Sequence, residues 1–249
     1  MVGVSMRPLI VLVAVALPAA AHADRRALTQ TSEYLTAADG QTEVELYTTQ
    51  TRSTWTDGAA ESFQLRLQLE HGVTDRWDVA LSHVFDQTSG DAATSTPLHL
   101  STAELRSRYR IAERGELPVD VAVHGTLAKQ FGASAYVGAA TIVVARDFGL
   151  LTIAGNAIGA IGFGGEVAKP AIEVGWAGGA TYELSPTWKA GAESWGGFDV
   201  EHTDRIEAWA GPAVSWAPSA RLWVTATAGF GVNDRSDRFS VRGIVGMAL

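Results

Sequence analysis

The alternation of side chains in the last eleven residues constrains the fold of this chain most strongly. One side of residues 239–249 is apolar and carries Phe239, Val241, Gly243, Val245, Met247 and Leu249. The other side carries small, polar and charged residues. A period of two predicts a β-strand with one apolar face. A soluble sandwich buries such a face in its core, whereas a membrane barrel turns it to lipid, so the rest of the chain must decide between them.

The first 23 residues have the pattern of a secretory signal peptide. Arg7 supplies a positive charge, residues 9–17 are apolar, and residues 21–23 (Ala-His-Ala) match a small-residue cleavage site. The apolar run is shorter than the roughly 20 residues that a membrane-anchoring helix needs. We therefore expect residues 1–23 to be removed and the exported chain to begin near Asp24.

Charge and cysteine content exclude several classes of protein. Without Arg7 the chain keeps 18 basic and 27 acidic side chains and has no basic cluster, which argues against nucleic acid as a partner. It contains no cysteine, so a disulfide framework and a thiolate metal site are both excluded. Stability must then come from a large core, a closed sheet or lipid. The 26 glycines and 18% charged residues fit β structure better than a helical bundle.

Alternating segments follow one another from residue 41 to the end of the chain. Residues 24–40 lack this periodicity, and we interpret them as an N-terminal lead-in that lies in the periplasm. Residues 41–249 predict an all-β fold, a single antiparallel up-and-down transmembrane barrel of about twelve strands. The expected segments are 41–50, 62–71, 77–85, 98–111, 119–131, 136–146, 150–162, 171–184, 188–198, 205–216, 221–232 and 238–249.

The connections between these segments indicate the orientation of the barrel. Short connections alternate with polar ones that are usually longer, as in outer-membrane barrels with short periplasmic turns and longer extracellular loops. An even number of strands places both termini on the periplasmic side.

Aromatic residues gather near the ends of the segments. If the first segment runs outward, one group lies near the periplasmic ends: Trp77, Tyr109, Tyr182, Trp188, Trp216 and Trp223. A second group lies near the extracellular ends: Phe63, Phe85, Phe131, Tyr136, Phe163, Phe198, Phe230 and Phe239. Two such groups match the aromatic girdles of membrane barrels, although aromatic residues also favour strand ends next to turns.

Residues 148–165 are the one stretch that could be read as a transmembrane helix. They contain no charged side chain over 18 residues, which reaches the usual length of a helical span. They also contain six glycines, and each Gly costs about 1 kcal/mol in a helix interior relative to Ala. We therefore predict a strand here, with a helix dimerisation face at Gly155 and Gly159 as the less favoured alternative.

The run LEHGVTDRWDVAL at residues 69–81 resembles the strand–turn–strand signature of small outer-membrane barrels of Gram-negative bacteria. That group includes transporters and barrels of the phenol-degradation meta-pathway. The last strand is similar to the carboxy-terminal signal that the barrel-assembly machinery reads, although it ends in Leu249 where the family pattern usually has Phe. The resemblance implies a protein of the outer membrane whose partners are the lipid bilayer, lipopolysaccharide and that machinery.

Polar residues on the inward side of the first five segments form the candidate site. They are Glu43, Glu45, Arg66, Asp78, Glu104, Arg106, Arg108, Arg110, Asp120 and His124. Opposite charges on neighbouring strands can pair across a sheet, and Arg can fork to a carboxylate. The last six segments turn mainly small residues inward, interrupted by Glu173, Glu183, Lys189, Glu193, Glu207 and Arg242.

Two interpretations of this lumen stay open. In the first, the charged side chains face a wall of small residues across a narrow aqueous path and tune its ion selectivity. Alternatively, long Arg and Glu side chains would cross the lumen and plug it, since a barrel of this size lies between the filled eight-stranded and the open sixteen-stranded cases.

The sequence predicts a passive outer-membrane channel or transporter for small polar or ionic solutes, with neither cofactor nor metal. One alternative is a structural or surface-interaction barrel whose loops, chiefly residues 51–61 and 86–97, bind other molecules. The other is a lipid-modifying enzyme. We disfavour an enzyme because the histidines are scattered and none has a G-x-S-x-G or H-E-x-x-H context. These histidines are His71, His83, His99, His124 and His202.

Overall fold

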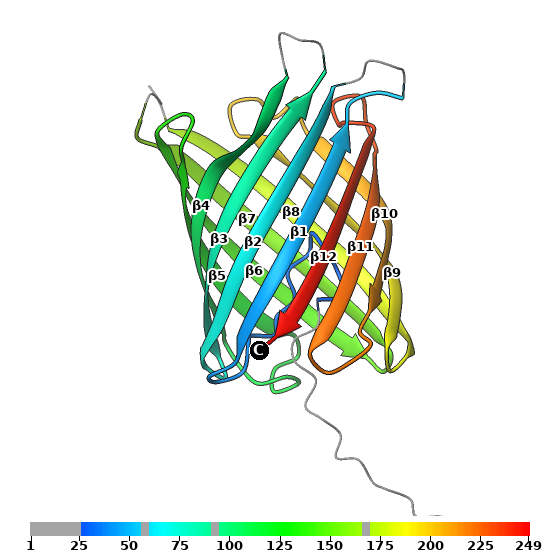
Figure 1. Ribbon diagram of the computed structural model, residues 1–249. Coiled ribbons are helices and arrows are strands. Elements are labelled where there is room, and N and C mark those ends of the chain that lie inside the picture. Colours follow the sequence, from blue (N-terminus) through cyan, green and yellow to red (C-terminus); the bar gives the residue numbers. More distant parts are fainter. Residues whose placement is uncertain (1–25, 56–59, 91–94, 166–169) are drawn as a thin grey trace, which may run out of the picture.

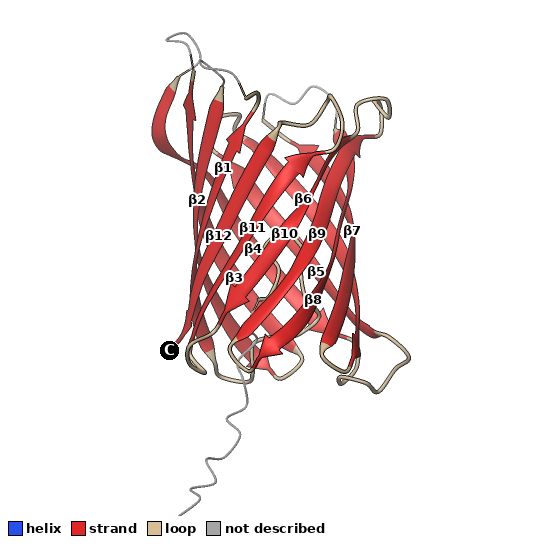
Figure 2. Ribbon diagram, turned by 90° about the vertical axis from the view of Figure 1, so that its right-hand side faces the viewer, coloured by secondary structure: helices blue, strands red, loops and turns tan. Residues whose placement is uncertain are grey.

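The computed structural model describes residues 26–55, 60–90, 95–165 and 170–249, so the expected signal peptide lies outside the described residues. Twelve β-strands form one closed antiparallel barrel (Figures 1 and 2). None of the described residues belongs to a helix long and apolar enough to cross a membrane. The prediction of an all-β up-and-down barrel is confirmed.

Each strand pairs with its neighbours in sequence, and β12 pairs with β1 to close the sheet. Closure leaves no free strand edge, so the backbone groups of the strands find partners within the barrel. The expected segments agree with the strands except for a few residues at their ends. The strands are β1 (Thr42–Arg52), β2 (Glu61–Thr74), β3 (Trp77–Ser89), β4 (Thr96–Arg110), β5 (Asp120–Gln130), β6 (Ala135–Phe148), β7 (Leu151–Phe163), β8 (Ala171–Ser185), β9 (Trp188–Asp199), β10 (Glu207–Trp216), β11 (Leu222–Gly231) and β12 (Phe239–Ala248).

The alternation of burial along each strand shows which side faces the lumen. In β4, Leu105 and Tyr109 are exposed on the outer surface, whereas Arg108 and Arg110 are buried inside. The outer surface therefore carries the apolar residues and the lumen carries the polar ones. This distribution is that of a membrane barrel and the reverse of a soluble sandwich.

The two ends of the barrel differ in their connections. At the end that holds the C-terminus, β2–β3, β6–β7 and β8–β9 are joined by two residues each, although residues 111–119 form a longer link (Figure 1). We call this the short-turn end and the opposite one the long-loop end. The uncharged segment forms β7, which confirms the strand prediction for it.

Most aromatic residues of the two expected girdles are exposed, among them Trp77, Tyr182 and Phe131. Trp223 is fully buried inside the barrel, and the girdle prediction is wrong for this residue. Its ring lies against Gly246, where an added Cβ would stand 2.1 Å from the indole. The physical reason is register, because β11 turns Trp223 to the same side as the buried Thr225 and Thr227.

Residues 26–37 run inside the barrel, in its short-turn half, and the exposed residues 38–40 lead from there to β1 at the rim (Figure 1). This placement differs from the periplasmic location expected for residues 24–40. Most of residues 26–37 are buried, including Leu28, Thr31 and Tyr34. We call residues 26–40 the lumenal segment.

The outward and inward faces of the barrel should respond differently to a new charge. Leu67 lies outward near the middle of β2, and Ala160 lies inward on β7. We expect Leu67→Arg to lower the free energy of unfolding by about 2–4 kcal/mol in lipid, as a charge at the bilayer midplane does. Ala160→Arg should cost much less, because its guanidinium reaches the lumen. Urea unfolding in phospholipid vesicles measures both, and equal losses would contradict the assignment of faces.

Candidate functional site

The candidate site is the contact between the lumenal segment and the charged wall of β1–β5. All ten predicted site residues lie on the inward side of these strands. The structure brings Glu45, Asp78, Arg106 and Arg108 together and leaves the other six outside this group, with His124 beside it as the register partner of Arg108. Two residues that the sequence analysis did not select, Arg26 and Glu70, complete the group. We call these six residues the charge cluster.

Glu70 lies at the centre of the charge cluster and is 1% exposed. Its carboxylate accepts hydrogen bonds from Arg108 Nη2 at 2.7 Å and from Arg26 Nη2 at 3.2 Å, and it contacts Arg106 Nη2 closely. Three arginines therefore converge on one buried carboxylate. Removing any one partner of such a group leaves an uncompensated charge away from water.

Asp78 and Glu45 balance the remaining positive charge. Asp78 accepts hydrogen bonds from Nε and Nη2 of Arg108, its register partner on β4, at 2.8 and 2.7 Å. Glu45 accepts one from Arg26 Nε at 2.6 Å and another from the Tyr47 hydroxyl at 2.7 Å. Three carboxylates and three guanidinium groups make the charge cluster neutral.

Arg66 and Glu104 form a separate ion pair on the long-loop side of the charge cluster. Their two nitrogen–oxygen contacts are both 3.0 Å long, and the pair spans β3 from β2 to β4. The sequence predicts ion pairs between neighbouring strands, whereas these long side chains reach across an intervening strand. His124 lies on the next strand, and neither of its ring nitrogens has a hydrogen-bond partner among the described residues.

The other predicted residues stabilise the short-turn end. Arg110 donates to the Asp75 carbonyl oxygen at 2.7 Å, and Asp120 accepts from the Gly115 backbone N–H at 2.7 Å. Glu43 accepts from Gln41 Nε2 at 2.7 Å. These contacts fix turns and do not join the charge cluster.

Glu193 on β9 binds the lumenal segment most extensively. Its carboxylate accepts hydrogen bonds from the backbone N–H groups of Thr29, Gln30 and Thr31 at 2.9, 3.0 and 3.0 Å. The hydroxyls of Thr29, Thr31 and Thr227 donate to it as well. Glu193 is 3% exposed, so its charge is stabilised by these donors rather than by water.

Further wall residues replace the hydrogen bonds that a helix or strand would give the lumenal segment. The Asn156 side chain accepts from the Ser32 N–H at 2.7 Å and donates to the Ser32 carbonyl oxygen at 2.9 Å. Ala37 N–H donates to Asp78 at 3.3 Å, and Gly40 N–H donates to the Gly72 carbonyl oxygen at 2.9 Å. Buried backbone polar groups need such partners. The segment is therefore fitted to this wall.

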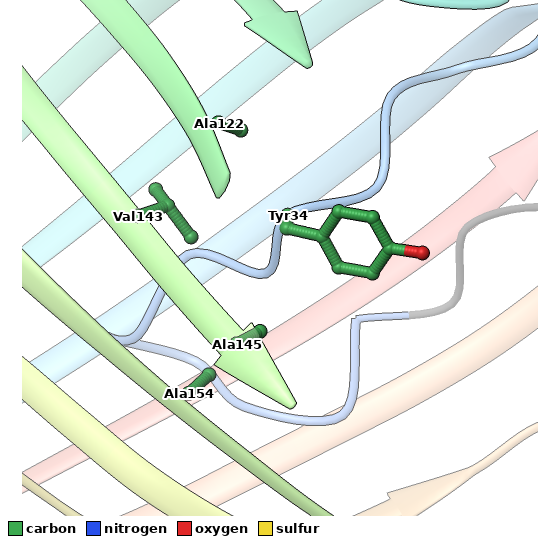
Figure 3. Close-up of a cluster of buried hydrophobic side chains, with 5 residues drawn as sticks. All are labelled: Tyr34, Ala122, Val143, Ala145 and Ala154. Atoms are coloured by element: carbon green, nitrogen blue, oxygen red, sulfur yellow. The ribbon is translucent and has the colours of Figure 1, made fainter. Parts of the chain in front are cut away.

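Small wall residues make room for the lumenal segment. A Cβ at Gly72 would lie 1.9 Å from the Ala38 carbonyl oxygen, and a Cβ at Gly179 would lie 2.8 Å from Leu28 Cδ1. Tyr34 packs in a cluster with Ala122, Val143, Ala145 and Ala154 (Figure 3).

The lumenal segment does not fill the barrel completely. Beside it, at the short-turn end, a cavity of about 260 Å³ is lined by residues that include Tyr34, Arg114, Asp147 and Lys189. A second cavity of about 520 Å³ lies toward the long-loop end, against β7–β10. Within the described ranges, no group of acidic and histidine side chains is arranged to hold a metal ion.

Comparison with known proteins identifies the fold. No protein family and no curated protein matches the sequence. The COG4313 outer membrane channel from Pseudomonas putida F1 has a similar structure, with a TM-score of 0.71, 12% identity and coverage of 89% of this chain and 100% of that one. The KdgM porin in complex with oligogalacturonate and the NanC porin give TM-scores of 0.59 and 0.56, each with 8% identity and 83% of this chain covered. The matches cover 99% and 98% of those porins. The chain thus has the fold of outer-membrane barrel channels.

The Glu193 carboxylate should hold the lumenal segment in place. The chain has no cysteine, so Ala27→Cys would give one buried reporter thiol. Hydrogen bonds to a charged group contribute about 1.5–3 kcal/mol each, and the loss of several should speed maleimide labelling of this introduced thiol at least tenfold in a Glu193→Ala background. Glu207→Ala, which lies far from the segment, is the matched control. Equal labelling rates in both backgrounds would remove Glu193 from this role.

Proposed function

We propose that this chain is a passive channel of the outer membrane for small polar or ionic solutes, and that the lumenal segment narrows it near the periplasm. One observation carries the proposal: the barrel encloses a polar lumen in which cavities remain on both sides of the segment. Charged residues around such a path tune which ions pass. The fold shared with proteins named as a channel and porins supports the same function.

The outer surface supports the proposed location. An apolar band flanked by exposed aromatic residues is suited to the hydrocarbon layer and its two interfaces. We infer that the short-turn end faces the periplasm and the long-loop end faces outward, where lipopolysaccharide would surround the barrel. We also propose that residues 1–23 direct export and that the terminal strand β12 is read by the barrel-assembly machinery.

The geometry distinguishes this proposal from the two alternatives. A purely structural barrel is favoured by the charge cluster and by the lumenal segment, which together fill much of the short-turn half. For an enzyme, Ser82 cannot act as a nucleophile for His83, because Ser82 is buried inside the barrel while His83 lies on the outer face of the same strand. A channel accounts for both the cavities and the polar lining.

Single-channel recording in planar bilayers tests the proposal directly. The full-length exported protein should give small discrete current steps in KCl, since the lumenal segment occupies much of the lumen. The double variant Arg26→Ala/Glu193→Ala loosens the segment and should give steps at least twice as large. Complete absence of steps in both proteins, with correct folding shown by heat-modifiable electrophoretic mobility, would contradict a channel.

The arginines of the charge cluster should control ion selectivity. Replacing Arg106 and Arg108 by Ala leaves Glu70 and Asp78 without their main partners, so the lumen becomes more negative. We expect the reversal potential in a KCl gradient to shift toward cation selectivity. Breaking buried pairs costs about 3–5 kcal/mol, so folding is checked in parallel. The control is Arg76→Ala at the exposed turn, and the same reversal potential in both variants would exclude the two arginines from the path.

A further inference from the structure

The cavity of about 520 Å³ at the long-loop end differs in character from the rest of the lumen. It is bordered by the inward faces of β7–β10 and by the loop between β9 and β10, and it is open to solvent. Glu173, Glu207, Asp199 and Trp209 line it from the strands, and His202 and Arg205 line it from the loop. We call it the mouth cavity.

An aromatic pair forms one wall beside the mouth cavity. Trp195 and Trp209 are register partners on β9 and β10, and their rings are stacked with centroids 6.2 Å apart at 15°. The Trp195 ring lies against Gly229, where an added Cβ would stand 2.1 Å from the ring. A larger residue at position 229 would therefore displace the Trp195 ring. Trp209 Nε1 donates to the Asp237 carbonyl oxygen at 2.9 Å. The pair is therefore fixed in position before any solute arrives.

Carboxylates of the mouth cavity lack the partners found in the charge cluster. Glu173 on β8 lies opposite Asp199 on β9, and Glu207 lies on β10 next to them. Within the described ranges, neither the Glu173 nor the Glu207 side chain has a hydrogen bond or an ion pair. Asp199 accepts from the Glu201 N–H at 2.7 Å and lies 3.8 Å from His202 Nδ1. Like charges on neighbouring strands repel each other unless a cation lies between them.

The basic residues of the mouth cavity do not cancel this charge. Arg205 and His202 belong to the exposed loop, and Arg205 has no ion pair within the part of the chain that the structure describes. Asp237, whose carbonyl oxygen holds Trp209, adds another acidic side chain nearby. The strands thus present unpaired carboxylates beside an aromatic ring. This combination binds organic cations that carry an apolar or aromatic group.

We propose that the mouth cavity is a binding subsite for an organic cation, such as an amine or quaternary ammonium compound that carries a ring. The proposal deepens the proposed function, because the subsite would select solutes at the entrance of the channel. The positive group lies between Glu173 and Glu207, and the ring packs against Trp209. An anion with the same ring would meet the carboxylates of Glu173, Asp199 and Glu207 against one guanidinium, that of Arg205, in the described lining, so repulsion should outweigh attraction.

Two probes of matched shape test this subsite. Benzyltrimethylammonium should bind the purified full-length protein saturably in calorimetric titration, whereas benzenesulfonate should not. Glu173→Gln/Glu207→Gln and Trp209→Leu should each weaken binding of the cation about tenfold or more. The control is Asp86→Asn, whose carboxylate already accepts a hydrogen bond from Gln64 Nε2 at 3.0 Å and lies outside the cavity. It should leave the affinity unchanged.

The outcomes separate this inference from the proposed function. Equal binding of both probes, or an affinity that none of the cavity variants alters, overturns the subsite even if the protein conducts ions. Saturable binding lost in the cavity variants supports the subsite even if bilayers show no current, because calorimetry does not depend on conduction. In a conducting protein, benzyltrimethylammonium added at the long-loop side should also interrupt the current, and the Glu173→Gln/Glu207→Gln variant should lose these interruptions.

Discussion

The closed sheet is the constraint on which the rest of this structure depends. Lipid offers no hydrogen bonds, so a chain that crosses it as strands must pair its backbone groups around a complete ring. Once twelve strands close, alternate side chains face the lumen, and the charged residues lie mainly there or at the ends, although single polar residues such as His83 lie on the outer face. Most charged side chains of the strands therefore lie in the lumen. Their ion pairs and hydrogen bonds determine the structure of the lumen.

The lumenal segment meets that requirement in the short-turn half. It supplies Arg26 to the charge cluster and offers three backbone N–H groups to Glu193. In return, Asn156 and Asp78 satisfy the backbone of a segment that has no regular structure of its own. Small residues of the wall leave the space for it. The charge cluster is paired, whereas Glu173 and Glu207 of the mouth cavity have no hydrogen bond or ion pair among the described residues. We therefore propose that one half narrows the lumen and the other recognises solutes.

The strands were predictable because alternation is a local property of the sequence. In β4, the alternation of Arg106, Arg108 and Arg110 with Ser107 and Tyr109 shows both the strand and its inward face. The prediction for Trp223 was wrong because its position near a strand end suggests an aromatic girdle, whereas the register of β11 turns it inward. Burial of a large ring there depends on Gly246 of the neighbouring strand, and a single strand does not contain that information.

The partners within the site could not be predicted in the same way. Glu193 and Thr29 are 164 residues apart, and nothing in residues 26–40 has a period that would place them in the lumen. Glu70 shares its face with Arg66, so its inward position followed from alternation. Its central role depends on three arginines from β4 and the lumenal segment. Arg66 reaches across β3 to Glu104, and a rule that pairs only neighbouring strands does not predict such a contact.

Amide hydrogen exchange of the protein in lipid bilayers tests the central claim most directly. If the lumenal segment is bound to the wall, the N–H groups of Thr29, Gln30, Thr31 and Ser32 exchange slowly, because each donates to Glu193 or Asn156. Their protection should approach that of the strands. Exchange as fast as that of the N–H groups of the exposed loop residues Thr203 and Asp204 would show that the segment is not bound to the wall and would contradict this account.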